Sequence, residues 1–200
     1  MLDSLLRRLE TVSRYAVWAG GAMLFFAAFM VTADVLIRAT TGRSMGGSDE
    51  ISGYLFAVST SWAFAHALLH RVNVRVDALY LFMGRSVQAI LDLLGVATLA
   101  VLVFVVTWRA AGVFEYSASY WSKSITPMQT PLAIPQFFWL LGLLLFSAAL
   151  IVVLLRCLIA LARWDRAAIE RLVGARTLTE EVEEEIHLSE SRVDPGRNGG

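Results

Sequence analysis

Residues 137–155 read FFWLLGLLLFSAALIVVLL, a stretch without a charged side chain, and the apolar run continues to Leu161. An α-helix rises ~1.5 Å per residue, so ~20 such residues cross the ~30 Å hydrocarbon layer of a bilayer. The stretch has that length, and Pro135 just before it suits the first turn of a helix. We therefore expect residues 137–161 to form a membrane-spanning helix.

Three further apolar runs of similar length precede this stretch, at residues 16–37, 51–69 and 87–108. Backbone polar groups in lipid must be satisfied within the segment, which favours helices over strands. Hydrophobic residues make up 57% of the chain and charged residues 17%, against ~25% charged residues in soluble domains. The first run exceeds the ~7–15 apolar residues of a cleaved signal sequence. The sequence thus predicts an all-α integral membrane protein with four transmembrane helices.

The predicted organisation is one membrane domain with short flanking segments. We expect residues 1–15 to be a cytoplasmic N-terminal segment and residues 16–161 to be the four-helix transmembrane domain. Residues 162–188 predict a cytoplasmic helical extension rich in glutamate, and residues 189–200 a disordered tail. Between the second and third runs, residues 70–84 mix charged and apolar side chains, which predicts a segment lying along the membrane interface.

The distribution of basic side chains predicts the orientation, because cytoplasmic connectors carry an excess of lysine and arginine. The N-terminal segment, the second connector and the C-terminal segment hold Arg7, Arg8, Arg14, Arg71, Arg75, Arg85, Arg163, Arg166, Arg171 and Arg176. The first and third connectors hold only Arg38, Arg43, Arg109 and Lys123. Both termini are therefore expected in the cytoplasm, with the first and third connectors on the outer side.

Polar side chains inside the apolar runs indicate where protein contacts are needed. The second run contains Ser59, Ser61 and His66, so we expect its polar face to pack against protein instead of acyl chains. Asp34 lies near the end of the first run, and Arg38 follows one helical turn later. A carboxylate at that depth needs a counter-ion, and the i, i+4 spacing supplies one.

The outer connectors carry helix-terminating signals. The first connector is rich in glycine and predicts a tight turn, after which Ser48 is expected to cap the second helix. Asp49 and Glu50 then fall in the first turn of that helix, where carboxylates complement the positive end of its dipole. The third connector has prolines at four-residue intervals from Pro127 to Pro135, which exclude a regular helix there.

Residue patterns for catalysis or cofactor binding are nearly absent. His66 and His70 lie one turn apart on the second run, which suggests a small four-helix cytochrome-like redox protein as an alternative. Bis-histidine haem ligation, however, needs imidazoles on opposite faces of the ring, and a closed metal site needs further ligands. There is no phosphate-binding loop, activated nucleophile or basic domain for nucleic acid. We therefore expect no enzymatic activity, no cofactor and no metal site.

The order of these features resembles one family, the small permease subunit of tripartite ATP-independent periplasmic (TRAP) transporters, of the DctQ type. The family has an arginine ending the first span, a glycine-containing turn, an acidic pair opening the second span and a tyrosine soon after. This chain matches with Arg38, Gly42, Asp49, Glu50 and Tyr54. An interfacial His-Ile-x-Val-Asp pattern and a Pro-Leu-x-Ile-Pro pattern before the last span are matched by residues 73–77 and 131–135. The resemblance covers residues 15–160.

Two positions depart from the family pattern. Gly47 stands where the family often has tryptophan before the acidic pair, and Asn73 stands where it usually has histidine. No role of that tryptophan or histidine is carried over to this chain. Asp77 retains the final aspartate of the interfacial motif, and Pro131 and Pro135 retain the prolines at the start of the fourth helix.

The resemblance implies a noncatalytic subunit of a sodium-coupled uptake system in the bacterial inner membrane. Its partners would be a large multi-span permease and a periplasmic substrate-binding protein that delivers an organic acid. The candidate contact residues for these partners are Asp34, Arg38, Asp49, Glu50 and Tyr54. An equally good interpretation gives these residues local roles, with Glu50 compensating the helix dipole and Arg38 neutralising Asp34.

Overall fold

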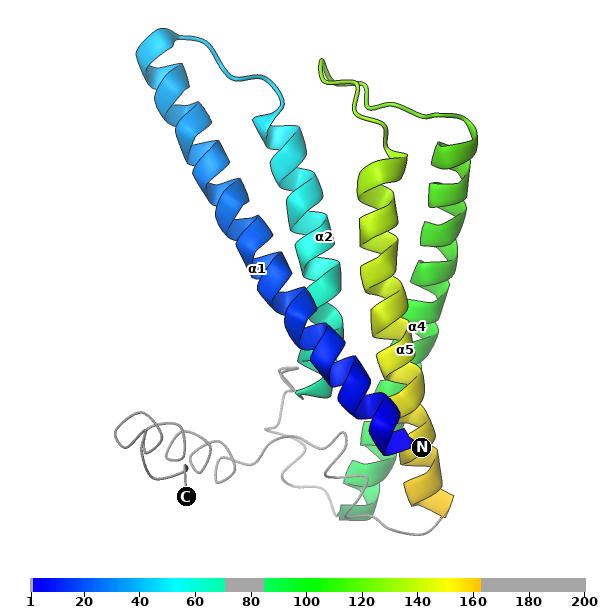
Figure 1. Ribbon diagram of the computed structural model, residues 1–200. Coiled ribbons are helices and arrows are strands. Elements are labelled where there is room, and N and C mark those ends of the chain that lie inside the picture. The colour runs from blue at the N-terminus through cyan, green and yellow to red at the C-terminus, as the bar shows by residue number, and fades with distance from the viewer. Residues whose placement is uncertain (1, 71–84, 163–200) are drawn as a thin grey trace, which may run out of the picture.

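The computed structural model describes residues 2–70 and 85–162, which form four helices and two connectors (Figure 1). The helices are α1 (Leu2–Thr41), α2 (Ser48–Leu69), α4 (Arg85–Ser119) and α5 (Ala133–Ala162). Within the described ranges the only pairing of extended backbone is an isolated bridge between Lys123 and Pro131. The predicted all-helical class is confirmed. The predicted interfacial segment with Asn73 and Asp77, the acidic extension after Ala162 and the C-terminal tail lie outside the described residues.

Three of the described helices are long and apolar enough to cross a membrane. They are the segments Ser4–Thr41, Ile90–Ser119 and Ala133–Leu161. Their surfaces carry many exposed large apolar side chains, among them Phe25 and Phe104, as expected of helices that face lipid or another membrane protein. The helix α2 is not among the three, because its serines, threonine and histidine lower its hydropathy.

The helix boundaries differ from the apolar runs mainly at their ends. The first helix runs from Leu2 through the arginines of the predicted N-terminal segment without a break. It ends at Thr41, where Gly42 takes a left-handed backbone with φ 71°. The helix α5 begins at Ala133, which places Pro135 in its first turn, where a missing N–H costs no helical hydrogen bond.

The start of α2 corrects one prediction. Gly47, with φ 103° and ψ −6°, occupies the N-cap position, and no side chain caps the helix. Ser48 is instead the first helical residue and is buried. The helix begins there because Gly47 can adopt the left-handed backbone that reverses the chain, so the capping role predicted for Ser48 is wrong.

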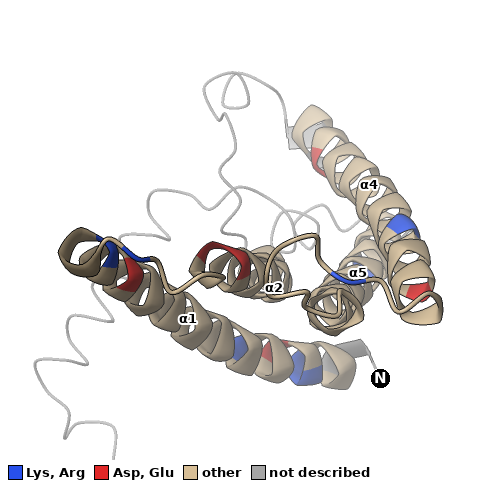
Figure 2. Cartoon of the chain, turned by 90° about the horizontal axis from the view of Figure 1, so that it is seen from above, with Lys and Arg blue, Asp and Glu red and all other residues tan. Residues whose placement is uncertain are grey.

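The spatial order of the helices differs from their order along the chain. The first helix packs on α2, α2 packs on α5, and α5 packs on α4, while the beginning of α1 also reaches α5. Viewed from above, the helices follow one another as α1, α2, α5 and α4 (Figure 2). Among the described helices, α5 therefore lies between α2 and α4, and α2 and α5 are the two inner helices.

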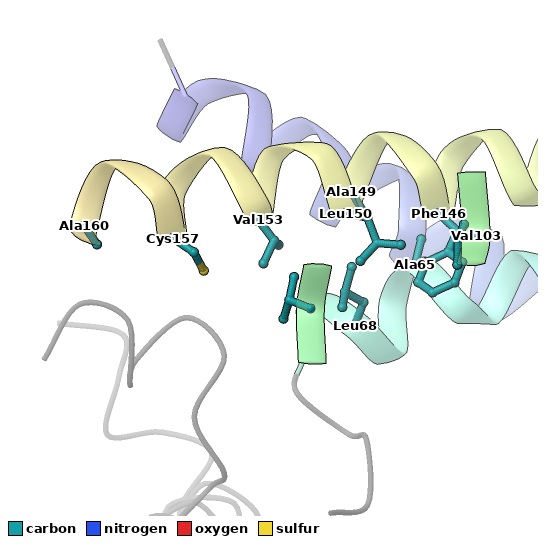
Figure 3. Close-up of a cluster of buried hydrophobic side chains, with 10 residues drawn as sticks. Ala65, Leu68, Val103, Phe146, Ala149, Leu150, Val153, Cys157 and Ala160 are labelled. Atoms are coloured by element: carbon teal, nitrogen blue, oxygen red, sulfur yellow. The ribbon is translucent and has the colours of Figure 1, made fainter. Parts of the chain in front are cut away.

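The buried core follows from this central position of α5. Of the ten clustered residues, α5 supplies Phe146, Ala149, Leu150, Val153, Cys157 and Ala160 (Figure 3). Ala65 and Leu68 come from α2, and Val96 and Val103 come from α4. The small side chains of Ala149 and Cys157, both with no exposed surface, let the backbones approach closely, as in other membrane helix packing.

Candidate functional site

The candidate site is the end of the molecule where the two described connectors meet the helices. We call it the connector end, and it comprises the turn at residues 42–47 and the connector at residues 120–132. Two carboxylates organise it, one from each of the first two helices. The structure thus brings together residues that the sequence placed at separate helix ends.

Asp34 is the first of these carboxylates, and only 1% of its surface is exposed. It accepts a hydrogen bond from the guanidinium of Arg38 at 2.5 Å, so the predicted counter-ion pair is formed. It also accepts hydrogen bonds from the backbone N–H of Met45 at 2.6 Å and from the hydroxyl of Ser44 at 2.9 Å. The carboxylate of Asp34 therefore holds the turn at residues 42–47 against the end of α1, and it also pairs with Arg38.

Glu50 is the second carboxylate and links two parts of the chain that are distant in sequence. Its Oε1 accepts a hydrogen bond from the hydroxyl of Tyr54 at 2.7 Å, one turn later on α2. Its Oε2 accepts a hydrogen bond from the hydroxyl of Thr126 in the α4–α5 connector. The start of α2 is thereby tied to the connector, and Glu50 does more than compensate the helix dipole.

The ionised form of Glu50 is the form that these hydrogen bonds favour. Glu50 lies just before the apolar run of residues 51–69. The hydroxyl of Thr126, and to a lesser extent that of Tyr54, lowers the pKa of this carboxyl, and partial burial opposes the effect. At neutral pH the tether therefore uses a carboxylate that accepts two hydroxyl hydrogen bonds. Asp49 beside it is exposed.

The α4–α5 connector has a defined backbone that orients its side chains. The N–H of Ser124 donates to Thr130 O at 2.9 Å, and the N–H of Leu132 donates to Ser122 O at 3.0 Å, on either side of the Lys123–Pro131 bridge. With the backbone closed in this way, Thr126 points towards Glu50, while Ile125 beside it is fully exposed.

The two connectors contact each other at Gly47. A Cβ at this position would overlap the sulfur of Met128 and lie 2.8 Å from its Cγ. The space that a larger residue would need at position 47 is thus taken by Met128. This contact gives a physical reason why this chain has glycine at position 47, where the family that it resembles often has tryptophan.

The polar side chains of α2 lie against neighbouring helices. Ser59 is 2% exposed and faces Gly20 of α1, where an added Cβ would lie 3.3 Å from its backbone. Ser61 is 1% exposed and faces Gly142 of α5. Beside it the indole N–H of Trp62 donates to Phe138 O at 2.9 Å. Both flanks of α2 are therefore covered by this chain.

His66 contacts His70, with 4.0 Å between the ring centroids. The Nδ1 of His66 is buried and has no hydrogen-bond partner among the described residues. The described ranges contain no group of three or more histidine, cysteine, aspartate or glutamate side chains placed to hold a metal ion. The pair is thus a contact between a histidine in the last turn of α2 and the histidine that follows the end of this helix.

Sequence reasoning missed four residues that complete the connector end, namely Ser44, Met45, Thr126 and Met128. Each acts through a contact with a residue from another segment, and none belongs to a pattern with a helical period. A serine and a threonine in polar connectors carry no local signal of their partners. Only the turn around Gly42 and the acidic pair indicated that this end of the molecule is organised.

Comparison with protein families gives a match over most of the chain. The family described as tripartite ATP-independent periplasmic transporters, DctQ component, matches residues 27–160. The matched part contains Asp34, Glu50 and Thr126, all of α2 and α4, nearly all of α5 and the last part of α1. No curated protein and no solved structure matches the chain.

Proposed function

The chain belongs to the DctQ-component family of tripartite ATP-independent periplasmic transporters, and on that basis we propose that it braces a large multi-span permease during sodium-coupled uptake of an organic acid. A periplasmic substrate-binding protein delivers the acid, and the permease carries the substrate and ion sites. In this proposal the chain acts without a catalytic step or a cofactor. The family match over residues 27–160 is the observation that carries the proposal.

The proposed topology has four spans, formed by α1, α4, α5 and, in addition to these three apolar helices, α2. The apolar run of α2 at residues 51–69 reaches ~28 Å at ~1.5 Å per residue, close to the ~30 Å thickness of the hydrocarbon layer. The low hydropathy of α2 does not oppose this placement, because Ser59 and Ser61 face Gly20 of α1 and Gly142 of α5. With four spans and the basic segments in the cytoplasm, the connector end faces the periplasm of the bacterial inner membrane.

The connector end is the proposed contact surface for the binding protein. The Glu50–Thr126 hydrogen bond holds the α4–α5 connector on the start of α2, and Ile125 and Trp121 stand out from this connector with 105% and 80% exposure. A rigid support under exposed apolar side chains is typical of surfaces that bind a protein. The exposed flanks of α1 and α4, which carry Phe25 and Phe104, are available to the large permease or to lipid.

Co-purification tests the assignment of the partners. An affinity-tagged copy of this chain should retain a large permease through purification in mild detergent. Proteoliposomes holding both subunits should accumulate the acid only with a sodium gradient and the binding protein, and omitting either membrane subunit should abolish uptake. Solute accumulation by this chain alone would contradict the proposal.

The alternative of a cytochrome-like redox protein gains no support from the family match. His66 in the last turn of α2 and His70 just after it have their ring centroids 4.0 Å apart, whereas bis-histidine haem ligation places the imidazoles on opposite faces of the haem. An absorption spectrum of the purified protein decides the matter, since a Soret band would favour the redox function.

A further inference from the structure

Arg109, which the sequence assigned to the third connector, lies inside α4. It belongs to the segment Ile90–Ser119, which is apolar enough to cross a membrane, and it is exposed on the surface of the helix. Its guanidinium has no ion-pair, hydrogen-bond or ring partner among the described residues. Because a guanidinium keeps its positive charge in proteins, the exposed face of α4 carries an unpaired cation.

Contacts between α4 and α5 give the depth of Arg109 in the membrane. The uncharged run of α5 begins at Phe137, and the centroid of this ring lies 5.9 Å from that of Phe114. Counted from Phe114, Arg109 is ~7.5 Å below this outer edge of the apolar layer. The hydroxyl of Ser147, a further ~15 Å along α5 from Phe137, is 3.0 Å from the hydroxyl of Thr107. Counted from Thr107, Arg109 is ~12 Å below the edge. Both contacts therefore place its Cα within the hydrocarbon layer.

The lipid phosphates are too far from Arg109 to neutralise this charge. Headgroups widen the ~30 Å hydrocarbon layer to ~40–45 Å, so the phosphates lie ~5 Å beyond its edge. Their distance from the Cα of Arg109 along the membrane normal is then ~12–17 Å. The six bonds from Cα to a guanidinium nitrogen span only ~7 Å. A charge at this depth pairs with an opposite charge, and here a protein has to supply it.

The other charged residues in the membrane part of the described chain do not supply the counter-charge of Arg109. Asp34 is paired on α1, Asp92 and Arg156 have other partners, and Glu115 lies one residue beyond the contact that marks the outer edge. The segments outside the described residues attach at the opposite end of the molecule, where α2 and α5 end and α4 begins (Figure 1). The counter-charge is therefore expected from another polypeptide.

The surface beside Arg109 has room for a helix of that polypeptide. Gly112, one turn further along α4, is exposed, and a Cβ built there would meet no atom within 4 Å. Trp108 and Tyr116 lie four residues before and after it on the same face, with 71% and 63% exposure. Small residues let membrane helices approach closely enough for polar side chains to pair, and arginine binds a carboxylate through two parallel hydrogen bonds.

We propose that Arg109 forms an ion pair with a carboxylate on a membrane-spanning helix of the large permease, which packs on α4 at Gly112. This inference rests on the proposed function and adds the helix and the charge through which the two membrane subunits meet. It also distinguishes the two exposed flanks of the chain. The flank of α1 at Phe25 faces lipid, because the carboxylate in the membrane part of α1, Asp34, is already paired.

Recovery of the permease with variants of the full chain tests the proposal. Arg109→Gln removes the charge, so the permease recovered with an affinity-tagged chain in mild detergent should fall about tenfold, since breaking a desolvated charge pair is costly. Arg109→Lys keeps the charge and should recover more permease than Arg109→Gln. The midpoint of thermal unfolding of the Arg109→Gln chain alone should not fall, because the lost side chain has no partner among the described residues.

The matched control is Arg14→Gln, the same substitution of an exposed arginine on α1. Permease recovery with this variant should equal that of the unmodified chain. Equal recovery with Arg109→Gln and Arg14→Gln would overturn the inference and leave the proposed function standing. If the unmodified chain recovered no permease, the proposed function and this inference would both be contradicted.

Cross-linking in native membranes identifies the counter-charge. Benzoylphenylalanine in place of Trp108 replaces one exposed aromatic side chain by another, next to Arg109. Irradiation should join it to a permease peptide with an aspartate or glutamate near the cross-linked residue. Arg109→Glu combined with a lysine in place of that carboxylate should restore the recovery that Arg109→Glu alone abolishes. An adduct with phospholipid only, or with another segment of this chain, would overturn the proposal.

Discussion

Glu50 accepts a hydrogen bond from Thr126, which lies 76 residues away in the sequence. This contact ties the first turn of α2 to the connector between α4 and α5. The same carboxylate also accepts a hydrogen bond from the hydroxyl of Tyr54, so a single acidic side chain joins two residues of α2 to the α4–α5 connector. The carboxylate on α1, Asp34, pairs with Arg38 and holds the turn that follows its own helix.

Replacing Glu50 should loosen the connector end. In Glu50→Gln the charge that strengthens both hydroxyl hydrogen bonds is lost, since bonds to an ionised acceptor are stronger than neutral ones. We expect the midpoint of thermal unfolding in detergent to fall by ~3 °C. Asp49→Asn is the matched control, because Asp49 is adjacent, exposed and also in the first turn, and its midpoint should change by less.

Thr126→Val tests whether the lower unfolding midpoint expected in Glu50→Gln comes from loss of the Glu50–Thr126 contact. Valine keeps the shape of threonine and removes the hydroxyl donor. Combined with Glu50→Gln, it should lower the midpoint by less than the sum of the two single changes, since residues in contact are not independent. Strict additivity in this double-mutant cycle, followed by the same thermal unfolding, would show that the two side chains do not interact.

The contribution of Glu50 should depend on pH. Hydrogen bonding lowers its pKa in the folded protein below the ordinary value of 4.5, so the unfolded state binds the proton more readily. The stabilisation is therefore complete well above pH 4.5 and disappears as the pH falls through the folded-state pKa. The difference in midpoint between the unmodified protein and Glu50→Gln should shrink over that range. A difference that stays constant into the acidic range would contradict this assignment.

Gly47 should not tolerate a side chain. Its φ of 103° is unfavourable for any residue with a Cβ, at a cost of at least ~1 kcal/mol, and the Cβ would collide with Met128. Gly47→Ala should therefore lower the free energy of unfolding, measured by denaturant titration in detergent. Adding Met128→Ala should recover only the part due to the collision, because the backbone strain remains.

Gly53→Ala is the control for the Gly47 prediction. Gly53 lies inside α2, and an added Cβ would meet no atom within 4 Å. Alanine is the better helix former, so this change should raise the free energy of unfolding by ~0.5–1 kcal/mol. If Gly47→Ala were as stable as Gly53→Ala, the predicted cost of backbone strain and of the collision with Met128 would be contradicted.

Gly142 should be required for the packing of α2 on α5. A Cβ there would overlap the hydroxyl of Ser61 and lie 2.6 Å from Cδ1 of Trp62. Gly142→Ala should cost ~1–3 kcal/mol through overpacking of this interface. Gly21→Ala on α1 has no atom within 4 Å of the new Cβ, and it should be neutral or stabilising in the same denaturant titration.

The sequence was informative wherever the signal is local. The apolar runs predicted the helices because hydropathy and helix length are properties of consecutive residues. The Asp34–Arg38 pair was predictable for the same reason, since an i, i+4 spacing places both side chains on one helical face. The capping role of Ser48 was predicted wrongly, because the backbone of Gly47 decides where α2 begins.

The partners of the two carboxylates could not be predicted in this way. Thr126 and Met128 approach α2 only because the chain returns to it through α5. A threonine in a proline-containing connector gives no sign of which distant carboxylate it will meet. The polar face of α2 shows the same limit, because serines predicted a need for protein contact without indicating that Gly20 and Gly142 supply it.

By itself, the sequence determined the all-helical class, the apolar helices and the family, because hydropathy, helical period and short motifs are written in neighbouring residues. Only the tertiary structure decided that α5 lies between α2 and α4, that Glu50 holds the α4–α5 connector, and that Thr107 of α4 lies beside Ser147 of α5. These features depend on how closely helix surfaces approach one another. That approach is set by the joint packing of residues such as Gly142, Ser61 and Ala149 from different helices, and no single segment encodes it.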